Sequence, residues 1–322
     1  MNAHLNSGYR RSWRFVLAAF LILLVAASLW LWRTFSPERR SFTEHRGSLR
    51  EANVSAPVVA GEGFVGQAVG LISDHGLAVN LRVLRPTSAE GRLPLVIMLG
   101  GHRTGRDAVD VVGNPGRIAV AALDYPYHGP ERLRGWRQIL GQVPAIQQGL
   151  LDTPPAISLA LDWLLEQPWV DPARIELMGV SLGVPFVAVA GANDRRFKRV
   201  WLIHGGVNNR EWLENRLESR IANNHLRHAA AGLLYGLAHG NSFNTGEWVA
   251  KISPRPVIIV GASEDEQMPR ESVEQLYAAA LAPKELQWST GGHVGPERVE
   301  IVRQLLALVR NRILADQETV RS

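Results

Sequence analysis

The sequence predicts an α/β fold in which a mostly parallel, twisted sheet is flanked by helices. Three observations support this class: short β-branched runs recur from residue 61 onward, longer amphipathic stretches separate them, and glycine or proline stands at their boundaries. Parallel neighbours need a long crossover connection, which the amphipathic stretches can supply as helices. With 46% hydrophobic residues, the chain of 322 residues can fill one large core or two ordinary ones.

The expected strands begin with a hairpin, because residues 62–72 and 76–85 flank the turn sequence Asp74-His75-Gly76. A continuous apolar run at 95–99 predicts a strand that is buried on both faces. Comparable runs predict the remaining strands at 117–123, 174–178, 199–204, 256–260 and 285–289.

A helix is expected at 153–167, where Thr153 can cap the start and Pro154 fits the first turn. Its apolar residues recur at helical spacing, at Ile157, Leu161, Leu164 and Leu165. Further helical patterns follow Ser181 and occupy 270–282 and 296–314.

One stretch interrupts the alternation of strands and helices. Residues 207–254 have helical spacing and many polar side chains but no strand pattern. Their apolar residues are sufficient for a small helical lid insertion that packs over the sheet; a purely structural helical layer is the alternative.

The amino-terminal segment has the features of a membrane anchor. Residues 1–14 form a basic tail, and 15–32 are an uncharged run of 18 residues that spans about 27 Å as a helix, close to the hydrocarbon thickness of a bilayer. Tryptophans stand at both ends of the run, as in an interfacial aromatic belt. We expect a single transmembrane helix that acts as a signal anchor; the alternative is a signal peptide cleaved after Ala27.

The charge pattern leaves the orientation of this segment open, because arginines lie on both sides of it. A short basic tail ordinarily stays in the cytoplasm, so we expect the catalytic domain on the non-cytoplasmic side. Residues 33–60 mix arginine, glutamate, serine and proline with little periodicity and predict a tether, which leaves 61–316 as the folded domain.

Composition excludes several functional classes. The formal net charge is +5 and the isoelectric point is near 9.9, but the arginines are scattered, so no nucleic-acid partner is expected. The absence of cysteine excludes disulfides and thiolate catalysis. No phosphate loop, dinucleotide fingerprint or H-E-x-x-H pair occurs in the sequence, so neither a cofactor nor a metal is expected. The oligomeric state stays open.

The strongest motif is Gly179-Val180-Ser181-Leu182-Gly183, which matches G-x-S-x-G. The predicted strand at 174–178 runs into it and a helical pattern leaves it, so the serine lies on a tight strand-to-helix turn. Such a turn needs glycines on either side of the nucleophile and places the serine oxygen beside the positive end of the helix.

The segment from Val170 through Gly183 resembles the nucleophile elbow of α/β-hydrolases, particularly the dienelactone-hydrolase and esterase-like branch. The resemblance extends over 61–316 and implies an α/β-hydrolase fold with Ser181 as the nucleophile. It also implies an acid after the strand at 256–260, where the spacing to the proline selects Asp265 and the spacing to the glycine selects Glu264. Asp265 is preferred, with Glu264 as the alternative acid.

The same resemblance places the base last in chain order, which assigns it to His293 in the glycine-rich loop at 290–295. It assigns the oxyanion hole to the backbone amides of Leu182 and His102. An imidazole is needed because an unactivated serine hydroxyl is a poor nucleophile, and a carboxylate fixes the tautomer of that imidazole. The loop at 124–129 and His204 are interpreted as architectural, without a direct role in the reaction.

These residues imply a serine hydrolase that cleaves a carboxylic ester, or a related acyl bond, of a small molecule through an acyl-enzyme. A lipase, a thioesterase or a peptidase would use the same triad. The alternative from another class is a non-catalytic, membrane-tethered binding protein that retains the fold.

Overall fold

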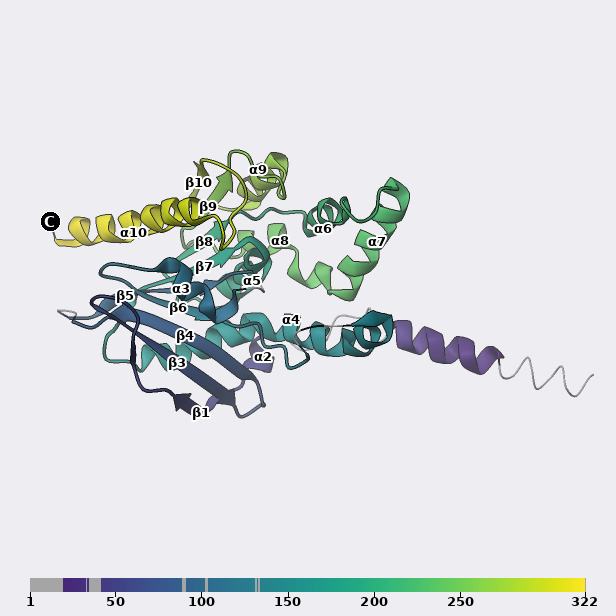
Figure 1. Cartoon of the computed structure of the whole chain (residues 1–322), viewed down its shortest axis with the longest axis horizontal. Helices are drawn as coiled ribbons and strands as arrows, with labels where there is room; N and C mark the ends of the chain where they lie inside the picture. Colours follow the sequence, from purple (N-terminus) through teal and green to yellow (C-terminus); the bar gives the residue numbers. More distant parts are fainter. Residues whose placement is uncertain are drawn as a thin grey trace, which may run out of the picture. The chain divides into compact units, whose positions relative to one another are not determined.

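The computed structural model of the chain describes residues 20–32, 34, 42–88, 91–101, 104–130, 132 and 134–321 (Figure 1). The chain divides into two compact units, Met1–Glu38 and Arg39–Ser322. In the first unit, residues 20–32 are helical and their large apolar side chains are exposed, from 47% for Leu24 to 69% for Ile22.

No helix within the described part of the chain combines the length and the apolar character that a membrane crossing needs. The expected span at 15–32 starts outside the described residues, because 15–19 are not among them, and the basic tail at 1–14 lies outside them as well.

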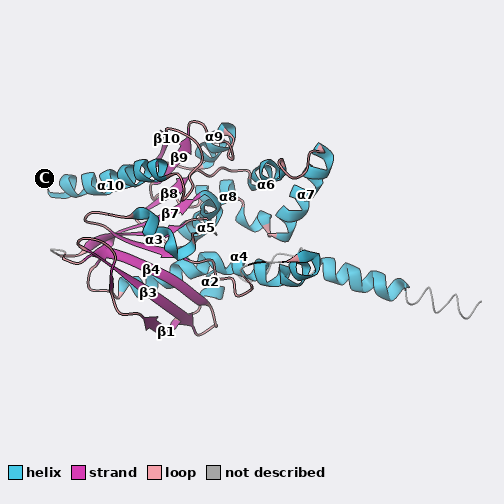
Figure 2. Cartoon of the chain, viewed as in Figure 1, coloured by secondary structure: helices cyan, strands magenta, loops and turns pink. Residues whose placement is uncertain are grey.

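The second unit is built on a ten-stranded sheet (Figure 2). The predicted hairpin is formed by β3 (Phe64–Ser73) and β4 (Ala78–Pro86), which pair antiparallel. From β5 onward the paired neighbours in the sheet's main path are parallel, with β5 between β6 and β7, whereas β4 pairs antiparallel with β6. The other strands of this region are β5 (Leu93–Leu99), β6 (Ala119–Leu123), β7 (Val170–Val180), β8 (Arg199–Ile203), β9 (Val257–Ala262) and β10 (Lys284–Ser289). Every predicted strand is confirmed.

Helices cover both faces of the sheet, as continuous apolar strands require. One face packs against α4 (Gly135–Leu165), α5 (Val184–Asn193) and α9 (Arg270–Ala279). The other face packs against α3 (Ala108–Val112) and α10 (Val299–Arg321). The two cores are separated by the sheet, because alternate side chains of one strand point to opposite faces.

The expected tether at 33–60 is wrong for its second half. Residues 42–60 contain α2 (Phe42–Arg46), β1 (Leu49–Val54) and β2 (Val58–Val59), and both strands pair with β3. Five of the six residues of β1 are exposed, so this edge strand has no apolar alternation for sequence analysis to find. The folded domain therefore includes residues 42–60 and does not start at 61.

The helix expected at 153–167 is the second half of a much longer one, α4. Thr153 does not cap it: its hydroxyl donates to the carbonyl of Gly149, 2.7 Å away, inside the helix. Pro144, Pro154 and Pro155 all lie within α4. A proline lacks an N–H and disfavours the helical conformation of the residue before it. The prolines at 154 and 155 therefore predict the start of a helix at a place where α4 continues.

The insertion predicted at 207–254 is helical, and it connects β8 to β9. It contains α6 (Asn209–Leu217), α7 (Asn224–Leu237), the short 3₁₀ helix η3 (Gly240–Phe243) and α8 (Thr245–Ala250). Asn208 and Asn223 cap α6 and α7, because each side chain accepts a hydrogen bond from a backbone N–H in the first turn. α6 and α7 lie side by side at the end of the sheet where β7 and β8 finish (Figure 1).

Candidate active site

Ser181 lies at the turn between β7 and α5, in a left-handed backbone conformation with φ of 53°. This conformation is uncommon for a residue with a side chain, and it persists because the surroundings enforce it. A Cβ on Gly183 would clash with the carbonyl of Leu99 on β5, and a Cβ on Gly179 would lie 2.8 Å from that of Val187. The two glycines of the motif therefore allow α5 to pack directly against the strands.

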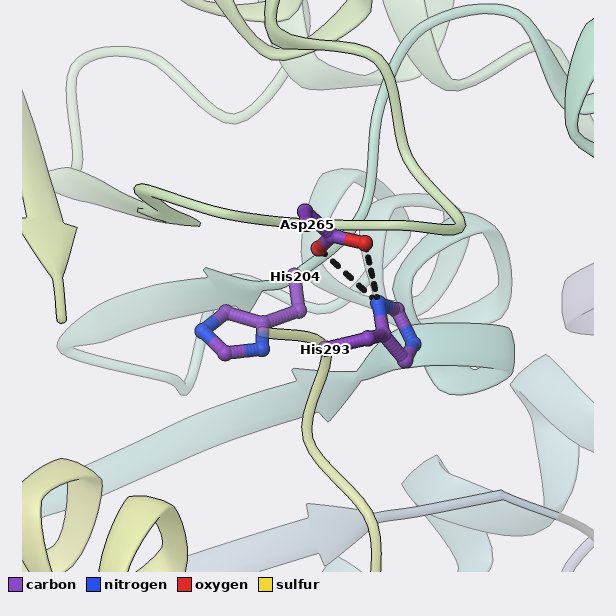
Figure 3. Close-up of side chains that lie close together, drawn as sticks. All are labelled: His204, Asp265 and His293. Carbon is purple, nitrogen blue, oxygen red and sulfur yellow. Dashed lines mark hydrogen bonds and ion pairs between the residues drawn. The ribbon is translucent and has the colours of Figure 1, made fainter. Parts of the chain in front are cut away.

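A continuous hydrogen-bond chain joins three side chains from three loops. The Ser181 Oγ lies 2.6 Å from His293 Nε2, and His293 Nδ1 lies 2.9 and 3.0 Å from the two carboxylate oxygens of Asp265. Figure 3 shows the carboxylate directed at the imidazole. The side chains of His293 and Asp265 are only 2% and 3% exposed, which strengthens the electrostatic interaction between them.

The structure brings Asp265, and not Glu264, to the imidazole. Asp265 Oδ1 also accepts hydrogen bonds from the backbone N–H groups of Gln267 and Met268, at 2.9 and 2.8 Å. Glu264 is exposed, and its backbone N–H donates to the carbonyl of Gly291. The one-residue ambiguity left by the sequence is therefore decided by which carboxylate the loop turns inward.

An ion pair that sequence analysis missed holds the backbone of His293 from both sides. Glu266 Oε2 accepts from the His293 N–H at 3.0 Å, and Arg298 donates to the His293 carbonyl at 2.8 Å. The two side chains meet at 2.6 Å. A Cβ on Gly292 would lie within 2.6 Å of both, so the glycine makes room for the pair. We call Glu266 and Arg298 the histidine clamp.

Desolvation tends to raise the pKa of the Glu266 carboxyl, but the hydrogen bonds from Arg298 and from the His293 N–H outweigh it and lower the pKa to about 2. The carboxylate of the clamp therefore stays ionised throughout the neutral and mildly acidic range.

His204 is completely buried at the end of β8, beside the ring of His293 (Figure 3). Its Nδ1 accepts from the N–H of Val294 at 2.9 Å, so the proton is on Nε2, which faces the hydroxyl of Ser289 at 2.9 Å. Burial, followed by repulsion from His293, lowers the pKa of His204 to about 4. His204 is a neutral residue that holds the loop carrying His293, in agreement with the architectural interpretation.

His204, Asp265 and His293 are close enough for a metal, since one possible ligand atom of each lies within 4.8 Å of the others. Their hydrogen bonds do not fit an ion, however. Both ring nitrogens of each histidine already have a partner within the protein. An ion would have to displace the bond between Asp265 and His293, which this site is built to make.

The loop expected to supply the oxyanion hole follows β5. Gly100 and Gly101 border the same cavity as Ser181 and Leu182, whereas His102 lies outside the described residues. The buried hydroxyl of Tyr125 donates to the carbonyl of Gly100 at 2.8 Å. Asp124 accepts from the backbone N–H of Arg106 at 2.8 Å. The loop at 124–129 thus braces the loop after β5, while His128 is exposed.

Two cavities meet at Ser181 and Leu182. The first, of about 270 Å³, is bordered by Gly100, Gly101 and His293 and extends between α3 and α10. The second, of about 200 Å³, lies between α5 and the α6–α7 insertion. Trp212 on α6 borders both cavities.

The fold is the α/β-hydrolase fold. In its sheet β5 lies between β6 and β7, Ser181 follows β7, and Asp265 and His293 follow the last two strands. Solved structures share this architecture over most of the chain. An acetyl xylan esterase from Paenibacillus sp. R4 has 18% sequence identity and a TM-score of 0.57, with 85% of this chain and 97% of that chain covered.

Acetyl xylan esterase 1 from Thermoanaerobacterium sp. JW/SL YS485 has 14% identity and a TM-score of 0.55, with 86% and 99% covered. A cold-adapted esterase from an Arctic intertidal metagenomic library has 16% identity and a TM-score of 0.53, with 80% and 97% covered. Neither a protein-family model nor a curated protein matches the chain. At these identities the likeness establishes the α/β-hydrolase fold and nothing further.

Proposed function

We propose that the protein is a serine hydrolase that cleaves the carboxylic ester of a small molecule through an acyl-enzyme. The observation that carries the proposal is the unbroken hydrogen-bond chain from Ser181 through His293 to Asp265. The esterases among the similar solved structures favour an ester over a thioester or an amide.

In the acylation step, Ser181 Oγ attacks the carbonyl carbon while His293 Nε2 takes the hydroxyl proton. Asp265 stabilises the imidazolium and keeps the other ring proton on Nδ1. The tetrahedral intermediate collapses when the bond to the leaving oxygen breaks, and His293 returns the proton to that oxygen. Water then attacks the acyl-enzyme with His293 as base, which releases the acid and restores Ser181.

The negative oxygen of the intermediate needs donors that are already in place. We assign this role to the backbone N–H groups of Leu182 and His102. Leu182 follows the nucleophile in the first turn before α5, where the positive end of the helix dipole adds to the effect.

A fluorophosphonate probe tests the nucleophile. The wild-type protein should become labelled on Ser181 and should hydrolyse p-nitrophenyl esters, whereas Ser181→Ala should lose both with an unchanged thermal unfolding curve. We expect the loss of kcat/KM to reach about 10⁴-fold or more. Ser219→Ala, at an exposed serine, is the matched control and should behave as the wild type. A folded wild type that neither labels nor turns over esters would favour a binding protein with this fold.

We also propose that residues 15–32 anchor the protein in a membrane, with the catalytic domain on the non-cytoplasmic side. The proposal rests on the uncharged run, on the tryptophans at its ends and on the exposed apolar side chains of residues 20–32. The full chain should stay in the membrane fraction after carbonate extraction. A chain that begins near residue 39, and so retains α2 and β1, should be soluble and active. A soluble, shortened species that begins near Ser28 would instead identify a cleaved signal peptide.

A further inference from the structure

The two cavities at Ser181 can be assigned to the two halves of an ester from the geometry of the reaction. The tetrahedral carbon has four substituents: Ser181 Oγ, the negative oxygen, the leaving oxygen and the acyl carbon. The leaving oxygen must come within hydrogen-bond distance of His293 Nε2 to receive its proton. His293 borders the first cavity and does not border the second. The leaving group therefore belongs in the first cavity.

The negative oxygen points in the same general direction: Leu182, one proposed donor, borders both cavities, but the loop after β5, which carries the other, borders the first cavity through Gly100 and Gly101 and not the second. Apart from Ser181 Oγ, the tetrahedral carbon has three substituents. Because the negative oxygen and the leaving oxygen both point to the first cavity, the acyl carbon points to the second cavity. Trp212 borders both cavities, as Ser181 and Leu182 do, so it lies where the acyl half and the leaving-group half of the ester meet.

The lining of the second cavity is largely apolar. Phe186 and Phe243 pack on each other with ring centroids 4.7 Å apart, and the ring of Tyr235 is seated over Gly240, which has no room for a Cβ. The polar Asn209 is already occupied, since its amide donates to the carbonyl of Phe243 at 3.0 Å. Among the residues that the structure describes, no charged side chain borders this cavity.

The first cavity has a different chemistry. Besides apolar side chains of α3 and α10, Arg216 and Glu297 border it, and Arg216 donates to the side chain of Gln267 at 3.0 Å. The contrast matches an ester with an apolar acyl group and a more polar leaving group, since a polar group buried in the second cavity would lose its hydrogen bonds to water.

Size defines the acyl group further. A water molecule takes about 30 Å³ in the liquid, so a cavity of about 200 Å³ holds roughly six or seven groups of that size. An acetyl group would leave most of this volume empty, and each further methylene that is buried should improve binding about three- to fourfold until the cavity is full.

We infer that the second cavity is the acyl-binding site, and that the protein prefers esters of straight-chain acids of about six to eight carbons to acetates. This inference rests on the proposed ester hydrolysis by Ser181. The first test is the kcat/KM of the wild-type protein for p-nitrophenyl esters from acetate to dodecanoate. We expect a maximum at hexanoate or octanoate that exceeds acetate by about tenfold or more, whereas a maximum at acetate would overturn the inference.

The second test fills one cavity at a time. Ala238→Phe adds a ring to the acyl cavity and should lower the octanoate-to-acetate ratio of kcat/KM about tenfold or more. Val111→Phe narrows the first cavity and should lower the rates for both esters alike, because their leaving group is the same. Leu233 lies on α7 like Tyr235, but its side chain is 55% exposed. Leu233→Phe should therefore leave the octanoate-to-acetate ratio unchanged. A ratio that falls in Val111→Phe and stays constant in Ala238→Phe would reverse the assignment.

Failure of the inference and failure of the proposed function are distinguishable. A wild-type protein that labels with fluorophosphonate and hydrolyses acetate best retains the function and refutes the acyl site. A wild-type protein that does not label at all refutes both. The wild-type profile needs no variant, so it decides the question even if Ala238→Phe does not fold.

Discussion

The loops that carry Ser181, Asp265 and His293 and the α6–α7 insertion above them are built in opposite ways. Nearly every polar atom around His293 has a partner: Asp265 and Ser181 at the ring, and the histidine clamp at the backbone. By contrast, α6 has no buried residue and α7 buries only Ala231, while Leu226 and Leu233 are 64% and 55% exposed.

In the proposed function the two regions have different tasks: the three loops carry out the reaction, and the insertion helps to select the substrate. Proton transfer needs atoms held within a fraction of an ångström, which requires many converging hydrogen bonds. A cavity wall that selects an acyl group needs only shape and apolar surface, and regions with few buried contacts are those that open most easily. Substitutions in the two regions should therefore differ in their effects.

The largest expected effect lies in the acid. Asp265→Asn should lower kcat about 10³-fold, because the amide cannot hold the imidazole in the tautomer that accepts the serine proton. Glu264→Gln, one residue away and exposed, should change kcat less than about twofold. Steady-state kinetics on one ester measure both. A reversed ranking would move the acid to Glu264 and would contradict the hydrogen bonds of the site.

His204 should contribute to the pH dependence of stability. Its pKa in the folded state is about 4, against 6.5 as its ordinary value. Between these pH values the unfolded state binds more protons than the folded state does. The free energy of unfolding therefore decreases as the pH falls from 6.5 to 4. The shift corresponds to about 3 kcal/mol.

The measurement is the free energy of unfolding of the wild type and of His204→Asn at pH 4 and at pH 6.5. Asparagine is chosen because position 204 has a φ of 52°, which asparagine tolerates. The advantage of the wild type over the variant should shrink by about 3 kcal/mol as the pH falls. A constant difference would show that His204 titrates normally.

The histidine clamp should affect turnover more than binding. Glu266→Ala removes the acceptor of the His293 N–H and should lower kcat about tenfold with little change in KM, because the imidazole is displaced while the cavities stay intact. Glu266→Gln keeps an oxygen at that place and should restore most of the loss. Glu274→Ala breaks an exposed ion pair with Arg270 and is the control that should have no effect. A loss expressed only in KM would argue against positioning.

The smallest effects are expected on α7. Leu226→Ser and Leu233→Ser should change the free energy of unfolding by less than about 0.5 kcal/mol, because both side chains already face water. Chemical denaturation measures this directly. A cost above about 1.5 kcal/mol would mean that these leucines are buried against something in solution, and the insertion would no longer count as the loosely packed region.

The sequence by itself determined the strands from β3 to β10, and it predicted that Ser181 and His293 belong to one site. It could do so because β-branched runs, glycine spacing at the elbow and the position of each loop after a strand are local properties. The sequence did not predict the edge strand β1, since an exposed strand lacks the alternation of apolar and polar residues that marks a buried face.

Tertiary structure decided what depends on residues far apart in the chain. Asp265 rather than Glu264 meets His293 because the loop after β9 turns one carboxylate inward, which a one-residue shift in spacing cannot reveal. The clamp joins Glu266 to Arg298, and the acyl cavity joins α5 to α6, α7 and η3; neither leaves a periodic trace in the sequence. Local patterns follow from the backbone of one segment, whereas a catalytic hydrogen bond and a cavity depend on how separate segments pack together.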